Sequence, residues 1–292
     1  MPTPTSFDEL RSRLSAETVL RDMPSSALRL CEAIDKGESS AAQLERIIMS
    51  DPALTAGVLR ASSAAAFGGY SKSATTIRQA IMVLGERAVR SLAVAVWVSG
   101  LVKNASASRF DAKRFAQHSM FVGLTARYLF SRQAKVKGVQ TKLISDEVFA
   151  CAVLHDLGLG LLAAADPDTF DATMVTAQAQ TRTPDQAFFD EFGHYPGALA
   201  ADVLLAWQLP SLFVHALQGW PTPLAQLEEV DALACIYYAN HLAEQFGESL
   251  LNWIPSTTPD QEVAELIALN EEEQTTIVEL IQGQMRAYQA AA

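Results

Sequence analysis

The stretch "AVLHDLGLGLL", residues 152–162, places a histidine and an aspartate side by side within an apolar helical run. Imidazole and carboxylate groups suit divalent transition metals, and a bound metal lowers the pKa of its water enough to make a nucleophile. The same two side chains can instead pair by hydrogen bonds in a core, because a buried aspartate needs a partner. His155 and Asp156 are therefore candidates for a metal site or for a buried polar pair.

Arginines provide a second candidate site, around the "AIMVLG" segment at residues 80–85. The candidate anion-binding face comprises Arg60, Arg78, Arg87 and Arg90. A solvated surface carries arginines in the same way, so both interpretations remain open. Neither a G-x-S-x-G nucleophile elbow nor a Walker or Rossmann glycine pattern occurs.

The composition is that of a globular protein, with 49% apolar and 19% charged residues among 292. We find no apolar run that predicts a bilayer span and no secretion signal, so we expect a cytoplasmic protein that does not associate with membranes. The three cysteines are widely spaced in apolar segments, which is typical of reduced core thiols.

The charge is acidic and uneven. The formal net charge is −11, with +3 in residues 1–110 and −14 in residues 111–292. Because an acidic protein is repelled by phosphate backbones, we do not expect a nucleic acid as partner. The asymmetry is explained either by two distinct faces or by a solvated acidic surface.

Nearly every segment predicts helix, because alanine and leucine dominate and strand alternation is absent. Start signals are frequent: Ser40 and Thr76 each precede a glutamine three residues later, and Asp51 precedes a proline. Helices are also predicted, approximately, at 111–131, 146–156, 167–180, 196–207, 210–218, 224–246 and 260–288. The fold class is therefore all-α.

Several segments, taken in order, match one family pattern: "SDPALTAGVLR", "IRQAIMVLG", "FAQHSMFVGLTARYLF", "EVFACAVLHDLGLGLLA" and "FGHYPGALAADVLLAWQLP". Together they resemble the HDOD domain, a helical relative of the HD phosphohydrolases that occurs in bacterial signalling proteins. The resemblance runs from about residue 20 to 220, with a looser continuation to about 248. It implies an N-terminal helical subdomain followed by an HD-like helical bundle. The expected domains are an N-terminal helix (1–19), the N-terminal subdomain (20–110), the HD-like subdomain (111–250) and a C-terminal helix (251–292).

The resemblance also implies which residues form the metal site. An HD-type site takes a histidine from one helix, a His-Asp pair from a second and a later aspartate. These positions correspond to His118, to His155 with Asp156, and to Asn240. Asn240 stands where the family pattern has aspartate, and an amide offers a neutral carbonyl oxygen but no charge. The site is therefore interpreted as degenerate, and a divalent metal held by His118, His155 and Asp156 remains an alternative.

Further departures from the active-enzyme pattern point the same way. Leu159 stands where active HD enzymes often have lysine, and Pro196 and Trp220 stand where two-metal relatives have histidines. The nearby His194 and His215 are out of register with those positions. His241 is expected to be a surface or capping group.

Three functions are weighed. The preferred one is a non-catalytic signalling or regulatory module that contacts other, unidentified signalling proteins, with no catalytic residues and no cofactor expected. The alternatives are a metal-dependent phosphohydrolase with a reduced ligand set, and a sensor that binds a nucleotide or another anion in the degenerate pocket. The sequence does not indicate the oligomeric state.

Overall fold

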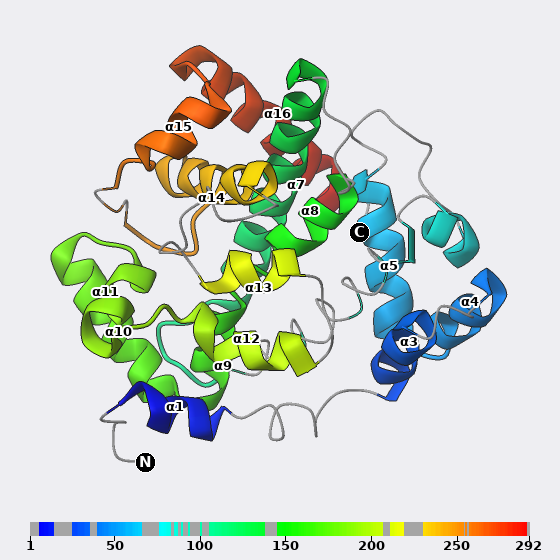
Figure 1. Cartoon of the computed structure of the whole chain (residues 1–292), viewed down its shortest axis with the longest axis horizontal. Helices are drawn as coiled ribbons and strands as arrows, with labels where there is room; N and C mark the ends of the chain where they lie inside the picture. Colours follow the sequence, from blue (N-terminus) through cyan, green and yellow to red (C-terminus); the bar gives the residue numbers. More distant parts are fainter. Residues whose placement is uncertain are drawn as a thin grey trace.

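The chain is described by a computed structural model that covers residues 6–14, 25–35, 40–65, 76–82, 85–86, 89, 93, 100, 105–137, 145–206, 211–218, 230–253, 255 and 257–290. Within these residues the regular structure is entirely α-helical, with no strand. The predicted all-α class is therefore confirmed. Figure 1 shows the helices of residues 25–65 on one side and the larger helical bundle on the other.

Three short helices form the group beside the bundle: α3 (Ser25–Asp35), α4 (Ala41–Met49) and α5 (Pro52–Ala65) (Figure 1). Their predicted caps are confirmed. The Ser40 hydroxyl accepts from the Gln43 amide at 3.2 Å, and the Asp51 carboxylate accepts from the Leu54 amide at 3.1 Å. These bonds satisfy amides that the first helical turn leaves unpaired.

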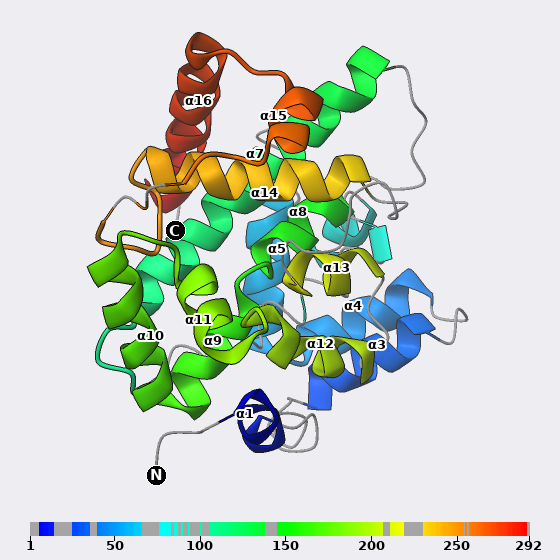
Figure 2. The same ribbon diagram turned by 60° about the vertical axis from the view of Figure 1, so that its left-hand side comes forward.

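The bundle is built on α7 (Ala112–Lys137), which packs along α8 (Ser145–Val153) and α14 (Val230–Gln245). The turn of the view in Figure 2 shows α14 lying across α7 near α8. The chain then passes through five short helices: α9 (Leu157–Ala165), α10 (Pro167–Gln180), α11 (Pro184–Phe192), α12 (Gly197–Ala206) and α13 (Ser211–Gln218).

The first helix, α1 (Phe7–Arg13), is fixed to the bundle although it lies far from it in sequence. Leu10 and Leu14 are fully buried, and Arg13 forms a 2.7 Å ion pair with Asp166 at the start of α10. The Phe7 ring stacks on His194 with centroids 4.1 Å apart. The histidine that the sequence places near the expected ligand position therefore contacts α1.

The helices differ from the sequence predictions in three places. His155 and Asp156 lie in a turn between α8 and α9, whereas the sequence predicts a helix through them. The last helix is divided into α15 (Gln261–Ile267) and α16 (Glu271–Ala290), because Ala268 adopts a left-handed conformation with φ of 50°. Helix α11 was not predicted, although the Thr183 hydroxyl caps it in the usual way.

One stretch of the described residues, Glu147–Ala165, is long and apolar enough to cross a bilayer by length and composition. It is mostly buried inside the bundle, and the turn at 154–156 divides it into α8 and α9. Core helices of soluble proteins share this composition, so the stretch is weak evidence for a membrane span.

Candidate metal centre and the cavity beside it

His118 projects from the second turn of α7 toward the turn that carries His155 and Asp156. Its Nε2 lies 3.1 Å from Asp156 Oδ2 and 3.3 Å from His155 Nε2. His155 Nε2 lies 3.3 Å from the same carboxylate oxygen. The three side chains are buried, with 1% of His118 exposed. Their ligand atoms lie within 4.8 Å of one another, and no other group of three such side chains does so in the described part of the chain.

The other nitrogen of each ring faces a backbone carbonyl oxygen. His118 Nδ1 is 3.0 Å from the Glu248 oxygen, and His155 Nδ1 is 2.8 Å from the Ala152 oxygen. Since a carbonyl only accepts, both Nδ1 atoms carry a hydrogen, as this network assigns them. Both Nε2 atoms then face each other and a carboxylate, so the cluster needs a cation at its centre. A proton on one imidazole or a divalent metal satisfies this requirement.

The electrostatics of the cluster favour a charged histidine. Burial lowers the pKa of His155, but the charge and hydrogen bond of Asp156 outweigh it and raise the pKa to about 9. Burial works to raise the pKa of Asp156, yet His155 and His118 hold it well below its usual range. Without a metal, the pair is therefore an imidazolium and a carboxylate at neutral pH.

Asn240, the fourth implied ligand position, lies on α14 at the wall of a neighbouring cavity. Its Nδ2 donates to Glu244 Oε1 at 3.3 Å, one helical turn further along. The amide is therefore engaged with a carboxyl group of its own helix.

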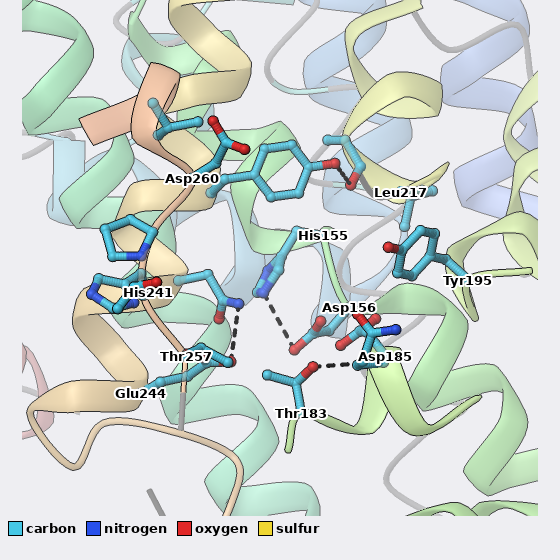
Figure 3. A pocket seen from close by; sticks show the side chains of 17 residues that line it. His155, Asp156, Thr183, Asp185, Tyr195, Leu217, His241, Glu244, Thr257 and Asp260 are labelled. Carbon is cyan, nitrogen blue, oxygen red and sulfur yellow. Dashed lines mark hydrogen bonds and ion pairs between the residues drawn. The ribbon is translucent and has the colours of Figure 1, made fainter. Parts of the chain in front are cut away.

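The cavity beside the triad has a volume of about 270 Å³. It lies between α11, α13, α14 and the segment 257–260, and Figure 3 shows His155 and Asp156 facing into it. Four carboxyl groups line it: Asp156, Asp185, Glu244 and Asp260. None of the described residues that line it is a lysine or an arginine.

Comparison with known proteins agrees with this geometry. The family model of the HDOD domain matches residues 20–220. The chain belongs to the HDOD family. No curated protein matches the sequence significantly.

Solved structures with the same fold include an HDOD domain protein of unknown function from Geobacter sulfurreducens, with a TM-score of 0.65, 16% identity and 97% of both chains covered. A protein from Marinobacter aquaeolei, named for signal transduction, has a TM-score of 0.68 and 18% identity, with 97% of this chain and 64% of that chain covered. A Shewanella amazonensis protein, named as a metal-dependent phosphohydrolase, has a TM-score of 0.58 and 18% identity, with 90% and 91% covered. At these identities the likeness shows the fold alone.

The remaining predicted residues of this HDOD protein lie apart from the cavity. Leu159 is buried in the apolar core. His194 is exposed and stacked on Phe7, and neither His194 nor His215 lines the cavity. Trp220 lies outside the described residues.

His241 is expected from the sequence to be a surface or capping group. It is half-buried and lines the cavity, because it lies on the α14 face that carries Asn240. Burial lowers its pKa.

The structure describes only one arginine side chain of the candidate anion-binding face. Arg78 forms a 2.9 Å ion pair with Glu45, which leaves 57% of the arginine side chain exposed. The side chain of Arg60, and all of Arg87 and Arg90, lie outside the described part of the chain. The anion-binding face stays a prediction.

Sequence reasoning missed two carboxyl groups of the HDOD cavity, Asp185 and Glu244. Glu244 follows Asn240 by four residues, so helical spacing places both on one face of α14. That spacing was available in the sequence. Asp185 follows the Thr183 cap and a proline, a pattern that predicts a helix start but not the cavity it faces.

The two missed carboxyl groups bind protons more strongly than usual. Burial, followed by the charge of Asp156, raises the pKa of Asp185 to about 7. Burial, followed by the charges of Asp185 and Asp156, raises the pKa of Glu244 to about 8. A carboxyl group with a raised pKa contributes stability at low pH that is lost as the pH rises from its unfolded value toward its folded value.

We therefore expect Glu244→Gln to reduce the alkaline loss of stability. Between pH 6 and pH 9 the free energy of unfolding of the wild type should fall by about 2 kcal/mol more than that of the variant, since glutamine cannot ionise. Urea unfolding at both pH values measures the difference. The control is Glu191→Gln, which removes an exposed carboxyl group from α11 and should follow the wild type. Equal pH dependence of Glu244→Gln and the wild type would contradict the buried state of Glu244.

Proposed function

We propose that this HDOD protein is a non-catalytic regulatory module that acts through contacts with other signalling proteins. The observation that carries the proposal is the acidic lining of the cavity. Four carboxyl groups line it without a described lysine or arginine. A phosphate ester entering this cavity meets carboxyl groups, and the cationic group at its wall among the described residues, the His155 imidazolium, is already paired with Asp156.

Two further features support the absence of hydrolysis. Asn240 replaces the aspartate that the family pattern has, and its amide donates to Glu244. Leu159 replaces the lysine frequent in active HD enzymes and is buried among apolar side chains.

The name of the Marinobacter relative agrees with a role in signal transduction. The net charge of −11 favours protein partners over nucleic acids, and we propose that the module acts in the cytoplasm.

A metal-dependent phosphohydrolase is the second candidate, and the triad geometry favours it. His118 Nε2, His155 Nε2 and Asp156 form a two-histidine, one-carboxylate set, and each Nδ1 is oriented by a carbonyl as in many metal sites. These three residues would hold a divalent metal, which when bound would supply a Lewis acid and an activated water. The Shewanella relative is named for such an activity.

Metal content and turnover distinguish the two candidates. The protein, purified without chelators, is assayed for bound metal and then for hydrolysis of bis(p-nitrophenyl) phosphate and nucleotides with added Mn²⁺. We expect no turnover above that of the His155→Ala variant. Stoichiometric metal together with turnover that His155→Ala abolishes would overturn the non-catalytic proposal. Asn240→Asp is the matched variant: it restores the family carboxylate and should increase metal affinity by about tenfold or more if the triad binds metal.

A further inference from the structure

The cavity beside the triad contains carboxyl groups that the metal site does not use. Asp185 enters from the first turn of α11 and Glu244 from α14 (Figure 3). Neither belongs to the three side chains whose ligand atoms converge within 4.8 Å. The two carboxyl groups therefore line a different part of the cavity from the metal triad. Because they project from separate walls, they suit an extended ligand better than a single metal ion.

The Glu244 carboxyl group lines the cavity and accepts few hydrogen bonds from the protein. It is 8% exposed and lines the cavity wall. Its Oε1 accepts one hydrogen bond, from Asn240 at 3.3 Å, and none of the described residues donates to Oε2. A carboxyl oxygen at the cavity wall that accepts no hydrogen bond from the protein is available to a ligand that donates.

One buried polar atom at the cavity wall lacks a partner. The Thr257 hydroxyl oxygen is covered from solvent and has no hydrogen-bond partner among the described residues. Thr257 lies on the segment that closes the cavity opposite α11, and Figure 3 shows it near Glu244. The wall beside Glu244 therefore carries an unsatisfied polar group.

Tyrosine rings complete the walls. The Tyr237 hydroxyl donates to the carbonyl oxygens of His215 at 3.3 Å and Ala216 at 3.2 Å, which fixes the ring at the cavity wall. Tyr195 lines the same cavity and packs against Phe189, with ring centroids 4.8 Å apart. Aromatic faces attract cations, and the attraction is larger where water is excluded.

We infer that this cavity binds a small organic cation that carries an ammonium or guanidinium group, held by Asp185 and Glu244 against the tyrosine rings. The inference deepens the proposed function and rests on it, because it gives the non-catalytic pocket a regulatory ligand. A volume of about 270 Å³ restricts the ligand to a small molecule. Binding of the cation stabilises the ionised form of both carboxyl groups and joins α11 to α14. Occupancy of the cavity therefore stabilises one arrangement of these elements.

Calorimetry and thermal unfolding of the full chain test the inference with agmatine and putrescine as probes. Inorganic phosphate and Mn²⁺ serve as comparison probes. We expect at least one amine to bind and, at about 100 times its Kd, to raise the unfolding temperature by about 5 °C. Asp185→Asn and Glu244→Gln, which keep side-chain shape, should each weaken binding by about tenfold. The exposed control Glu191→Gln on α11 should bind as the wild type does.

The inference is overturned if neither amine binds, if both carboxamide variants bind them with wild-type affinity, or if only Mn²⁺ or phosphate binds. Its failure is distinguishable from that of the proposed function. Phosphoesterase turnover with intact amine binding would refute the non-catalytic role alone. The absence of both turnover and amine binding would refute the ligand alone.

Discussion

Gly158→Ala should destabilise the protein by about 3 kcal/mol or more. A Cβ atom at this position would overlap the backbone of Pro196 and Gly197, where α12 begins. Backbone atoms cannot move aside as the end of a flexible side chain can, so α9 and α12 would have to separate. Urea or thermal unfolding measures the loss, which corresponds to a decrease of about 6 °C or more in the unfolding temperature.

The matched control for this effect is Gly283→Ala in α16. Among the described residues, the nearest neighbour of a Cβ atom there would be the end of the Arg286 side chain, at 3.9 Å. Because alanine is a better helix former than glycine, this change should stabilise the protein by about 0.5–1 kcal/mol. If the free energy of unfolding of Gly158→Ala lies within about 1 kcal/mol of the wild-type value, the starts of α9 and α12 are not in close contact.

Asp156→Asn is expected to have the second large effect. It should lower the free energy of unfolding by about 3 kcal/mol near pH 6. The change leaves His118 and His155 facing each other without the carboxylate that both contact. Since the pKa of His155 is raised to about 9, its contribution is complete below about pH 6.5 and is lost as the pH rises through 9. The difference between wild type and variant should therefore be greatest near pH 6 and smaller at pH 9.5.

Unfolding free energies at pH 6 and pH 9.5 test this dependence. Asp168→Asn, an exposed aspartate in the first turn of α10, is the control and should change stability by less than about 0.5 kcal/mol at either pH. A loss at Asp156 that is the same at both pH values would contradict an imidazolium at His155.

Local sequence patterns predicted the helices well where the chain itself supplies the cap. The bonds at Ser40 and Asp51 form as expected, because each acceptor lies within three residues of its amide. The turn at His155 and Asp156 was not predicted, since its apolar surroundings fit a continuous helix equally well. The glycine after the pair is explained only by the backbone of Pro196, which lies 38 residues away in sequence and beside it in space.

The site was predicted as far as the family resemblance reaches. His118, His155 and Asp156 meet as implied, from elements that the hydrophobic pattern located only approximately. Asp185 could not be assigned to the same cavity, because its place depends on how α11 packs against the bundle. Charge counts along the chain likewise describe an acidic half, yet they do not reveal that several carboxyl groups line one cavity.

The two walls of the cavity are joined at one point by an indole. Trp253 Nε1 donates to the Arg182 carbonyl oxygen at 3.2 Å, and this bond joins the segment before Thr257 to the residues that lead into α11. Separating the walls breaks the bond and exposes the half-buried ring to water. Water shifts indole fluorescence to longer wavelengths, so a variant that keeps Trp253 and lacks the other three tryptophans would report optically on access to the cavity.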